Sequence, residues 1–112
     1  MAEKVKETKF DVIFAIVNNG FADEVMVAAK EAGARGGTIL RARGSSNIGV
    51  DKKYGITLNP EKEVLMIVAK SDEKDKIMDA LYQASQADVK NKCVIFSLPI
   101  EDTVGLKYDN DK

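Results

Sequence analysis

The amino-acid sequence predicts an α+β fold built from two consecutive units, each made of a strand, a helix and a strand. Apolar segments and two amphipathic helical patterns follow one another in that order, and one long connection separates the two halves. The chain has 112 residues, which is the length of one ordinary domain. We therefore expect residues 1–112 to form a single domain, with a core at about residues 9–99, a long loop at 44–60 and a polar tail at 101–112.

The first unit begins with a segment that is typical of a strand buried on both faces. Residues from Phe10 to Val17 are apolar except for Asp11. After a turn at residues 18–20, apolar side chains recur with helical spacing at Phe21, Val25, Met26, Ala29 and Ala32. The helix is predicted to end at Gly33, which suits the left-handed conformation that follows a helix C-terminus.

The second strand is predicted at residues 36–43, because its side chains alternate between two faces. One face carries Thr38, Leu40 and Ala42, and the other carries Ile39, Arg41 and Arg43. Residues 44–60 then contain glycines, serines and the charged run Asp51-Lys-Lys53, without a strand or helix pattern of their own. A connection of this length is usually functional or mobile, and we expect it to be mobile.

The second unit repeats the order of the first. A largely apolar strand is predicted at Glu63–Ala69, followed by a helix that Ser71 or Asp72 can cap. The expected buried stripe of this helix is Ile77, Met78, Leu81 and Ala84. The fourth strand is predicted at residues 92–98, and Pro99 is expected to stop it.

The order of these elements predicts a ferredoxin-like split βαβ-βαβ arrangement. In this fold the four strands form one antiparallel sheet and both helices cover the same face. The other face stays uncovered, and we expect it to carry apolar side chains such as Ile39. An uncovered apolar face predicts a homo-oligomer in which copies of the chain cover one another's sheets.

Composition argues against several classes of function. Seventeen basic and eighteen acidic residues give a net charge of −1, which offers no bulk field to attract nucleic acid or anionic lipid. Aromatic residues make up 6% of the chain and none lies in residues 36–43, so a base-stacking sheet is not expected. The chain has no histidine and one cysteine, Cys93, which we interpret as a small buried hydrophobe. We therefore expect no enzyme and no metal site made by protein ligands alone.

The N-terminus is charged and has no apolar segment of the kind found in signal peptides. The longest apolar runs, residues 12–17 and 64–69, are too short to span a membrane. With its single cysteine, the chain is therefore expected to be cytoplasmic and not inserted into a membrane.

One segment carries a recognisable motif. Residues 33–44 read Gly-Ala-Arg-Gly-Gly-Thr-Ile-Leu-Arg-Ala-Arg-Gly, which resembles the Gly-x-x-Gly-x-Thr-x-x-x-x-(Lys/Arg)-Gly stretch of nitrogen-regulatory PII signal-transduction proteins. The resemblance extends over about residues 9–99 and includes Leu58-Asn-Pro60 at the end of the long loop. It identifies the chain as a divergent PII-like member of that superfamily.

The resemblance implies a trimer whose clefts between subunits bind ATP or ADP, often with 2-oxoglutarate, and whose long loop docks on a regulated enzyme or transporter. By the same resemblance, nitrogen metabolism is the expected pathway. The implied nucleotide-binding positions are Gly36, Gly37, Thr38, Arg43, Gly44 and Lys92. The implied partner-loop positions are Ile48, Val50, Lys52, Lys53, Tyr54 and Ile56. Tyr54 aligns approximately with a tyrosine that some members modify.

Departures from the family pattern predict weak nucleotide binding. Residues 89–92 read Val-Lys-Asn-Lys where the family has Gly-x-Gly-Lys, so only Lys92 remains as a phosphate contact. Residues 100–105 lack the two arginines that the family supplies to the phosphates, and Glu61 stands where the family has a lysine, which weakens the case for 2-oxoglutarate. Each missing charge-assisted hydrogen bond costs roughly 1.5–3 kcal/mol.

Two alternatives to a nucleotide sensor stay open. Arg41 and Arg43, which share one face of the second predicted strand, and the nearby Arg35 are the best local candidates for an anion site, although they could equally pair with acidic residues of a neighbouring subunit. The chain could then be a PII-like oligomeric sensor of another small anion. It could also be an interaction scaffold that binds no ligand.

Overall fold

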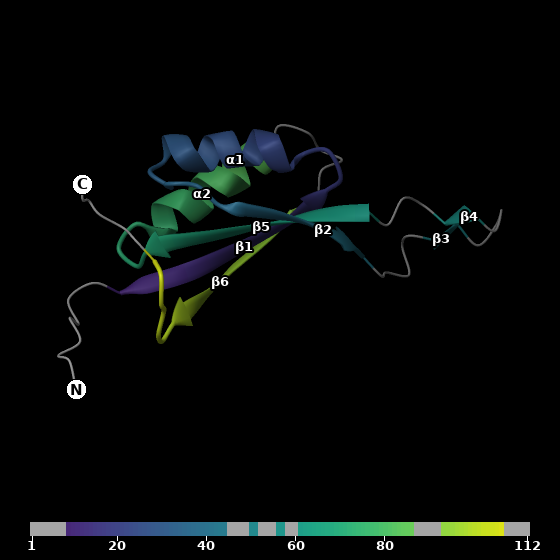
Figure 1. Ribbon diagram of the computed structural model, residues 1–112. Coiled ribbons are helices and arrows are strands. Elements are labelled where there is room, and N and C mark those ends of the chain that lie inside the picture. The colour runs from purple at the N-terminus through teal and green to yellow at the C-terminus, as the bar shows by residue number, and fades with distance from the viewer. Residues whose placement is uncertain (1–8, 45–49, 52–55, 58–60, 87–92, 107–112) are drawn as a thin grey trace.

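The computed structural model describes residues 9–44, 50–51, 56–57, 61–86 and 93–106 of the chain (Figure 1). The elements, in chain order, are β1 (Phe10–Asn18), α1 (Ala22–Glu31), β2 (Thr38–Arg43), β3 (Val50–Asp51), β4 (Ile56–Thr57), β5 (Glu61–Lys70), α2 (Lys74–Ser85) and β6 (Val94–Ile100).

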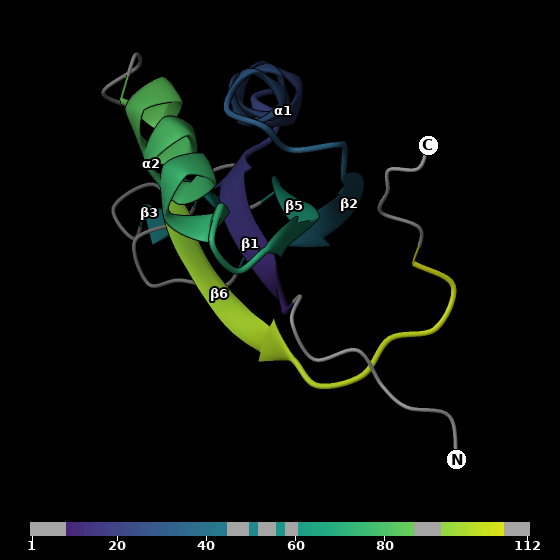
Figure 2. The same cartoon turned by 90° about the vertical axis from the view of Figure 1, so that its left-hand side faces the viewer.

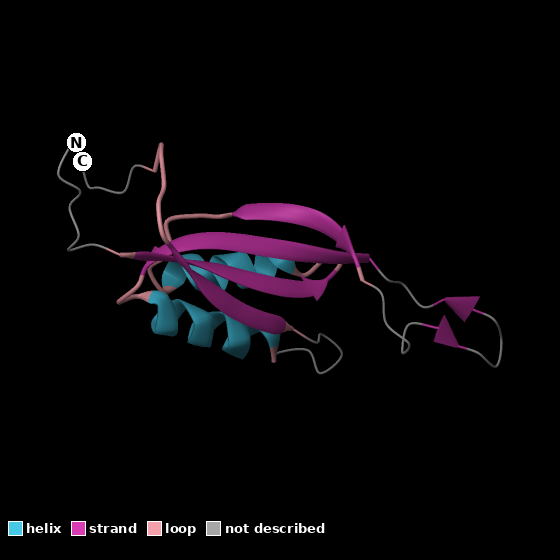
Figure 3. Ribbon diagram, turned by 90° about the horizontal axis from the view of Figure 1, so that it is seen from below, coloured by secondary structure: helices cyan, strands magenta, loops and turns pink. Residues whose placement is uncertain are grey.

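Four strands form one antiparallel sheet in the order β2-β5-β1-β6. Both helices lie on the same face of this sheet (Figures 1 and 2). The view from the opposite side shows the strands with no helix in front of them (Figure 3). The predicted ferredoxin-like split βαβ-βαβ fold is therefore confirmed, with both edge strands, β2 and β6, following a helix in the chain.

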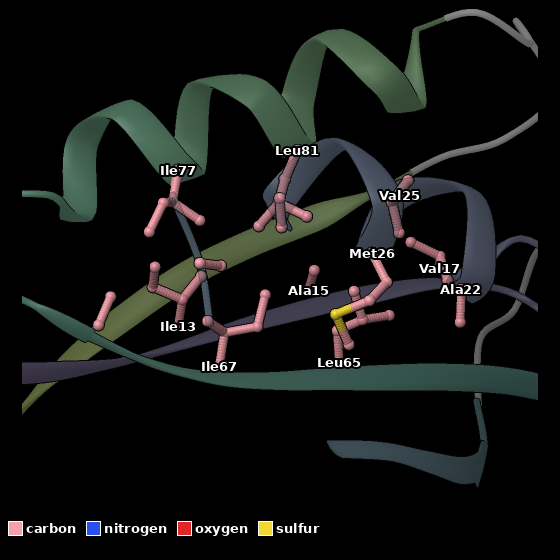
Figure 4. Close-up of a cluster of buried hydrophobic side chains, with 13 residues drawn as sticks. Ile13, Ala15, Val17, Ala22, Val25, Met26, Leu65, Ile67, Ile77 and Leu81 are labelled. Atoms are coloured by element: carbon pink, nitrogen blue, oxygen red, sulfur yellow. The ribbon is translucent and has the colours of Figure 1, made fainter. Parts of the chain in front are cut away.

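The core lies between the sheet and the two helices (Figure 4). Residues of β1 alternate strictly between buried and half-buried, so Ile13, Ala15 and Val17 face the helices. Leu65 and Ile67 of β5 face the same layer and are fully buried. The helices bring aliphatic side chains onto them, which are Ala22, Val25, Met26 and Ala29 from α1 and Ile77 and Leu81 from α2. This layer orients the sheet and with it the ends of the strands.

Alternation correctly divided β2 into two faces, but the prediction that Ile39 lies on the uncovered face is wrong. Ile39 pairs with Leu65, which is fully buried under the helices, and directly paired residues of adjacent strands point to the same face. Leu40, paired with Val64, is the residue that faces the open side. Ile39 is still 38% exposed because β2 is an edge strand.

The last strand extends further than predicted. β6 continues through Pro99 to Ile100, and Pro99 pairs with Asp11 of β1. A proline has no backbone N–H to donate, but an edge strand needs hydrogen bonds on one side only. Because β6 is an edge strand, Pro99 does not end it.

The start of α2 also differs from the prediction. Its N-cap residue is Glu73, and no side chain caps it there. The Ser71 hydroxyl donates instead to Oδ1 of Asp11, which is 7% exposed, and the Ser71 N–H donates to the Lys9 carbonyl at 2.8 Å. Ser71 thus joins the turn before α2 to the start of β1.

The long connection contains two short strands that the sequence pattern did not predict. β3 and β4 pair antiparallel, with Val50 opposite Thr57 and Asp51 opposite Ile56. They form a separate two-stranded sheet, away from the four-stranded one (Figure 1). Most other residues of the predicted loop lie outside the described part of the chain, so its mobility stays a prediction.

The face of the sheet opposite the helices is apolar. Its side chains include Phe10, Val12, Phe14 and Ile16 of β1, Leu40 of β2, Val64, Met66 and Val68 of β5, and Val94, Phe96, Leu98 and Ile100 of β6. The rings of Phe14 and Phe96 stack with centroids 5.1 Å apart. Val94 is 59% exposed and Leu98 is 51% exposed, so the chain by itself leaves this face in contact with water.

Candidate anion-binding site

A cavity of about 370 Å³ lies at the end of the sheet where β2 ends and β5 begins. Its lining consists of Asn19, Arg41, Ala42, Arg43, Glu61 and Lys62. Asn19 comes from the turn between β1 and α1, and the other residues come from the last three positions of β2 and the first two of β5. The site therefore lies at both ends of the long connection, residues 44–60.

The pairing of β2 with β5 brings these residues together. Arg43 lies opposite Glu61, and Ala42 lies opposite Lys62. Arg41 lies opposite Glu63, one position beyond the cavity lining. Because neighbouring residues on a strand point to opposite faces, the two arginines lie on the helix side of the sheet and Lys62 on the open side.

The lining is predominantly basic. It contains two guanidinium groups and one ammonium group, against the single carboxylate of Glu61. Arg41 and Arg43 are both exposed, and among the described residues neither guanidinium forms a hydrogen bond or an ion pair. A guanidinium presents its donors in a planar fork that matches carboxylate and phosphate oxygens. Chemically, the cavity suits a small anion with several oxygen atoms.

Two contacts from β5 hold the turn between β1 and α1 against the cavity. Lys62 Nζ donates to Asn18 Oδ1 at 2.7 Å, and the Asn19 N–H donates to the Glu61 carbonyl at 3.3 Å. These bonds orient the turn from which Asn19 reaches the cavity. Lys62 thus meets the cavity with its ammonium already bonded to one polar group.

The nucleotide-binding positions expected from the motif lie along β2 and on either side of it. Gly36 and Gly37 precede the strand, Thr38 begins it on the open face, and Gly44 follows its last residue, Arg43. At about 3.3 Å per residue, Thr38 and Gly44 are roughly 20 Å apart along the strand. Of this set only Arg43 lines the cavity, and Lys92 lies outside the described residues.

Gly37 has a packing role that the sequence did not reveal. A Cβ atom at this position would lie 2.9 Å from the Met66 carbonyl oxygen, from Ile67 Cγ1 and from Met26 Cε. Glycine is therefore required where the chain passes between α1 and β5 into β2. This requirement exists without any ligand.

Sequence reasoning identified the two arginines as anion candidates but missed Asn19 and Lys62 as their neighbours. Arg35, the third candidate, does not line the cavity. Periodicity identifies residues on one strand that share a face, whereas only the register between two strands and the path of a turn bring Asn19 and Lys62 to Arg41. The one available signal was the cluster of polar residues at both ends of the long loop.

The partner-loop residues are only partly within the structure. Val50 and Ile56 belong to the paired backbones of β3 and β4. Ile48, Lys52, Lys53 and Tyr54 lie outside the described residues, so their role stays a prediction.

Cys93 lies in a second cavity of about 540 Å³, between α2 and the start of β6. Burial raises the pKa of the Cys93 thiol, and a hydrogen bond with Ser85 opposes this effect without cancelling it. A raised pKa keeps the thiol protonated near neutral pH and therefore weakly reactive. Within the described ranges, no three acidic, histidine or cysteine side chains are grouped to hold a metal ion, and no helix is long and apolar enough to cross a membrane.

A four-stranded antiparallel sheet with two helices on one face is consistent with the PII ferredoxin-like fold. The sequence matches the family of nitrogen regulatory protein P-II over residues 10–110. The chain therefore belongs to the P-II family, whose members are signalling and regulatory proteins.

Solved structures show the same fold. One is a PII-like signalling protein from Thermus thermophilus, with a TM-score of 0.61 and 14% identity over 82% of this chain and 87% of that chain. Another is the PII protein of Arabidopsis thaliana bound to citrate, with a TM-score of 0.63 and 24% identity over 83% of this chain and 78% of that chain. No individually curated protein sequence matches the chain.

Proposed function

We propose that this chain is a cytoplasmic regulatory sensor, not an enzyme, that binds a small anionic effector beside β2 and signals to a partner protein through residues 44–60. The observation that carries the proposal is the grouping of Arg41, Arg43 and Lys62 around one cavity. Because this cavity lies where residues 44–60 leave and rejoin the sheet, an anion bound there would change the charge at both ends of that segment. The regulated partner would be an enzyme or a transporter, and nitrogen metabolism is the pathway that the family suggests.

An adenine nucleotide is the first effector class to test. Thr38 would contact the base at the start of β2, and the backbone near Gly44 would approach the phosphates roughly 20 Å away, with Arg43 and Lys92 adding charge. Gly36 and Gly37 would let the chain pass close to the base. The missing glycines at residues 89–91 and the missing arginines at 100–105 lead us to expect weak binding of ATP or ADP.

Small carboxylates are the second effector class, and the lining of the cavity favours them. Two guanidinium groups without an acceptor among the described residues can each bind a carboxylate with two hydrogen bonds. The Arabidopsis PII structure contains citrate, an anion of this kind. The carboxylate of Glu61 in the lining would oppose any such anion, and 2-oxoglutarate also lacks the lysine that the family resemblance places at this position.

We also propose that the protein is a homotrimer. The apolar side of the sheet leaves Phe96, Leu98 and Leu40 between 39% and 51% exposed, and contiguous exposed apolar surface often marks a site of protein association. Packing of three such faces around one axis would bury them, and it would bring each β2 close to a neighbouring subunit.

Isothermal calorimetry with ATP, ADP, AMP, citrate, bicarbonate and 2-oxoglutarate tests the effector. We expect Arg41→Gln and Arg43→Gln each to lower the affinity for the anion by about tenfold or more, because each substitution removes a charge-assisted hydrogen bond. Lys76→Gln is the matched control, because it removes the same charge from an exposed position near the start of α2, at the other end of the sheet. Binding that is equally strong in all three variants would exclude the cavity as the anion-binding site.

Lys92→Ala separates the two effector classes. If the nucleotide occupies the length of β2, this substitution should lower the affinity for ATP and leave the affinity for citrate unchanged. No heat with any of these anions would leave only the interaction scaffold among the functions considered.

Sedimentation equilibrium at micromolar protein concentration tests the proposed trimer, and a monomer at that concentration would exclude it.

A further inference from the structure

Glu63 lies beside the cavity and has a role at the start of α1. The N-cap residue of this helix, Phe21, supplies no side-chain cap. Glu63 Oε1 accepts the Gly20 N–H at 3.0 Å and the Ala22 N–H at 3.1 Å instead. The first N–H groups of a helix have no partner within the helix, and a negative charge there also stabilises the helix dipole. The cap of α1 therefore comes from β5, 41 residues away in the sequence.

The same side chain lies opposite Arg41. The two residues are directly paired across β2 and β5, so their Cβ atoms are about 5 Å apart on the helix side of the sheet. The hydrogen bonds to Gly20 and Ala22 use Oε1, and among the described residues Oε2 forms none. The charge of Glu63 is thus held at a fixed place beside the strand position of Arg41, although the two side chains form no ion pair in the structure.

We infer that Glu63 is a positioning residue that connects the anion cavity to α1. Its Oε1 caps the helix, and its charge attracts Arg41 as an internal counter-ion, so an anion that enters the cavity competes with Glu63 for this guanidinium. This inference deepens the proposed function, because it names the residue that sets how tightly the cavity holds an anion.

The size of the competition is set by Coulomb's law. Two charges about 6 Å apart in water, screened by 0.1 M salt, alter an equilibrium by about twofold per ligand charge. Replacing Glu63 by glutamine removes the charge but keeps an oxygen that can accept the two N–H groups. Citrate carries about three charges, so we expect Glu63→Gln to raise the affinity for citrate by roughly two- to tenfold. This gain in affinity should shrink at about 0.5 M salt.

Glu61→Gln is the matched control for the cap. Glu61 is one of the residues that line the cavity, but its side chain is not the acceptor for Gly20 or Ala22. In amide hydrogen exchange of the ligand-free protein, Glu63→Ala should accelerate exchange at Ala22 by about two- to thirtyfold, the equivalent of a lost helix cap. Glu63→Gln should accelerate it less, and Glu61→Gln should leave it unchanged. Unchanged exchange in Glu63→Ala would overturn the capping role.

A double-mutant cycle tests the attraction between Arg41 and Glu63 without any ligand. Wild type, Arg41→Gln, Glu63→Gln and the double variant are unfolded in urea at one fixed protein concentration. We expect a coupling of about two- to fivefold in the unfolding equilibrium constant, which decreases with salt. Absence of coupling would overturn the counter-ion role.

Failure of this inference is distinct from failure of the proposed function. If Arg41→Gln weakens the binding of citrate or ATP while Glu63→Gln leaves both affinities unchanged, the cavity binds anions but Glu63 does not compete with them for Arg41. If neither anion binds the wild type, the proposed function fails, and the exchange and cycle measurements still decide whether Glu63 links β2 to α1.

Discussion

Substitution of Gly37 separates a structural requirement from a ligand contact within the motif at residues 33–44. The residue lies just before β2 and does not have a positive φ, so alanine brings no backbone strain there. The added Cβ would lie 2.9 Å from the Met66 carbonyl oxygen, a backbone atom that cannot move without disturbing β5. Met26 Cε and Ile67 Cγ1 lie equally close, but these side-chain ends can shift.

The expected magnitude for Gly37→Ala combines two opposing effects. Overpacking of a core by one methyl group costs about 1–3 kcal/mol, and loss of the conformational freedom of glycine in the unfolded chain returns about 0.4–1 kcal/mol. The two ranges combine to a net loss in the free energy of unfolding of about 0–2.6 kcal/mol. Because the Met66 carbonyl oxygen cannot move aside easily, we expect a loss in the upper part of that range, about 1–2.5 kcal/mol. For a chain of this size that corresponds to a decrease in Tm of roughly 3–10 °C.

Urea denaturation at a fixed protein concentration measures this loss, and Thr38→Ala is the control. Thr38 is the next residue and is exposed, so its truncation should change stability by less than about 0.5 kcal/mol. If Thr38 contacts a nucleotide, this variant should lose affinity for ATP while it keeps its stability. An alanine variant at position 37 as stable as the wild type would show that the Cβ fits and that packing does not explain this glycine.

Three further predictions concern contacts outside the cavity. Ser71→Ala removes the hydroxyl donor from the buried Asp11 carboxylate and should lower the free energy of unfolding by about 1–3 kcal/mol in urea denaturation, whereas Asp72→Ala, an exposed neighbour, should cost less than about 0.5 kcal/mol. The pKa of the Cys93 thiol is raised in the folded protein, so the contribution of the thiol to stability is complete below the unfolded pKa of about 8.5 and is lost as the pH rises through the folded pKa. Cys93→Ala should abolish this loss of stability at high pH. Rapid alkylation of the thiol in the native protein at pH 7 would contradict the raised pKa. Leu98→Asp places a charge on the open face, where the side chain is 51% exposed, and should dissociate the proposed trimer in sedimentation experiments, while Val27→Asp, 56% exposed on α1, should leave it intact.

The sequence by itself determined the type and order of the main elements and the family. The continuous apolar run of β1 and the helical spacing in α1 and α2 depend only on neighbours in the chain, and the predicted strand and helices are confirmed. The prediction that β1 is buried on both faces is wrong for the single chain, because only the face toward the helices is buried. Gly33 follows the helix with φ +118°, as expected for a residue in the C′ position. The motif at residues 33–44 likewise needed no tertiary information.

Only the tertiary structure decided which face of β2 is open and what surrounds Arg41. A period of two separates Ile39 from Leu40 but does not say which of them faces the helices, because that depends on the register with β5. The cap of α1 by Glu63 and the bond between Ser71 and Asp11 each join residues more than 40 positions apart. A carboxylate or a hydroxyl can satisfy a backbone or side-chain group anywhere that the fold brings it within about 3 Å, so its partner leaves no periodic trace in the sequence.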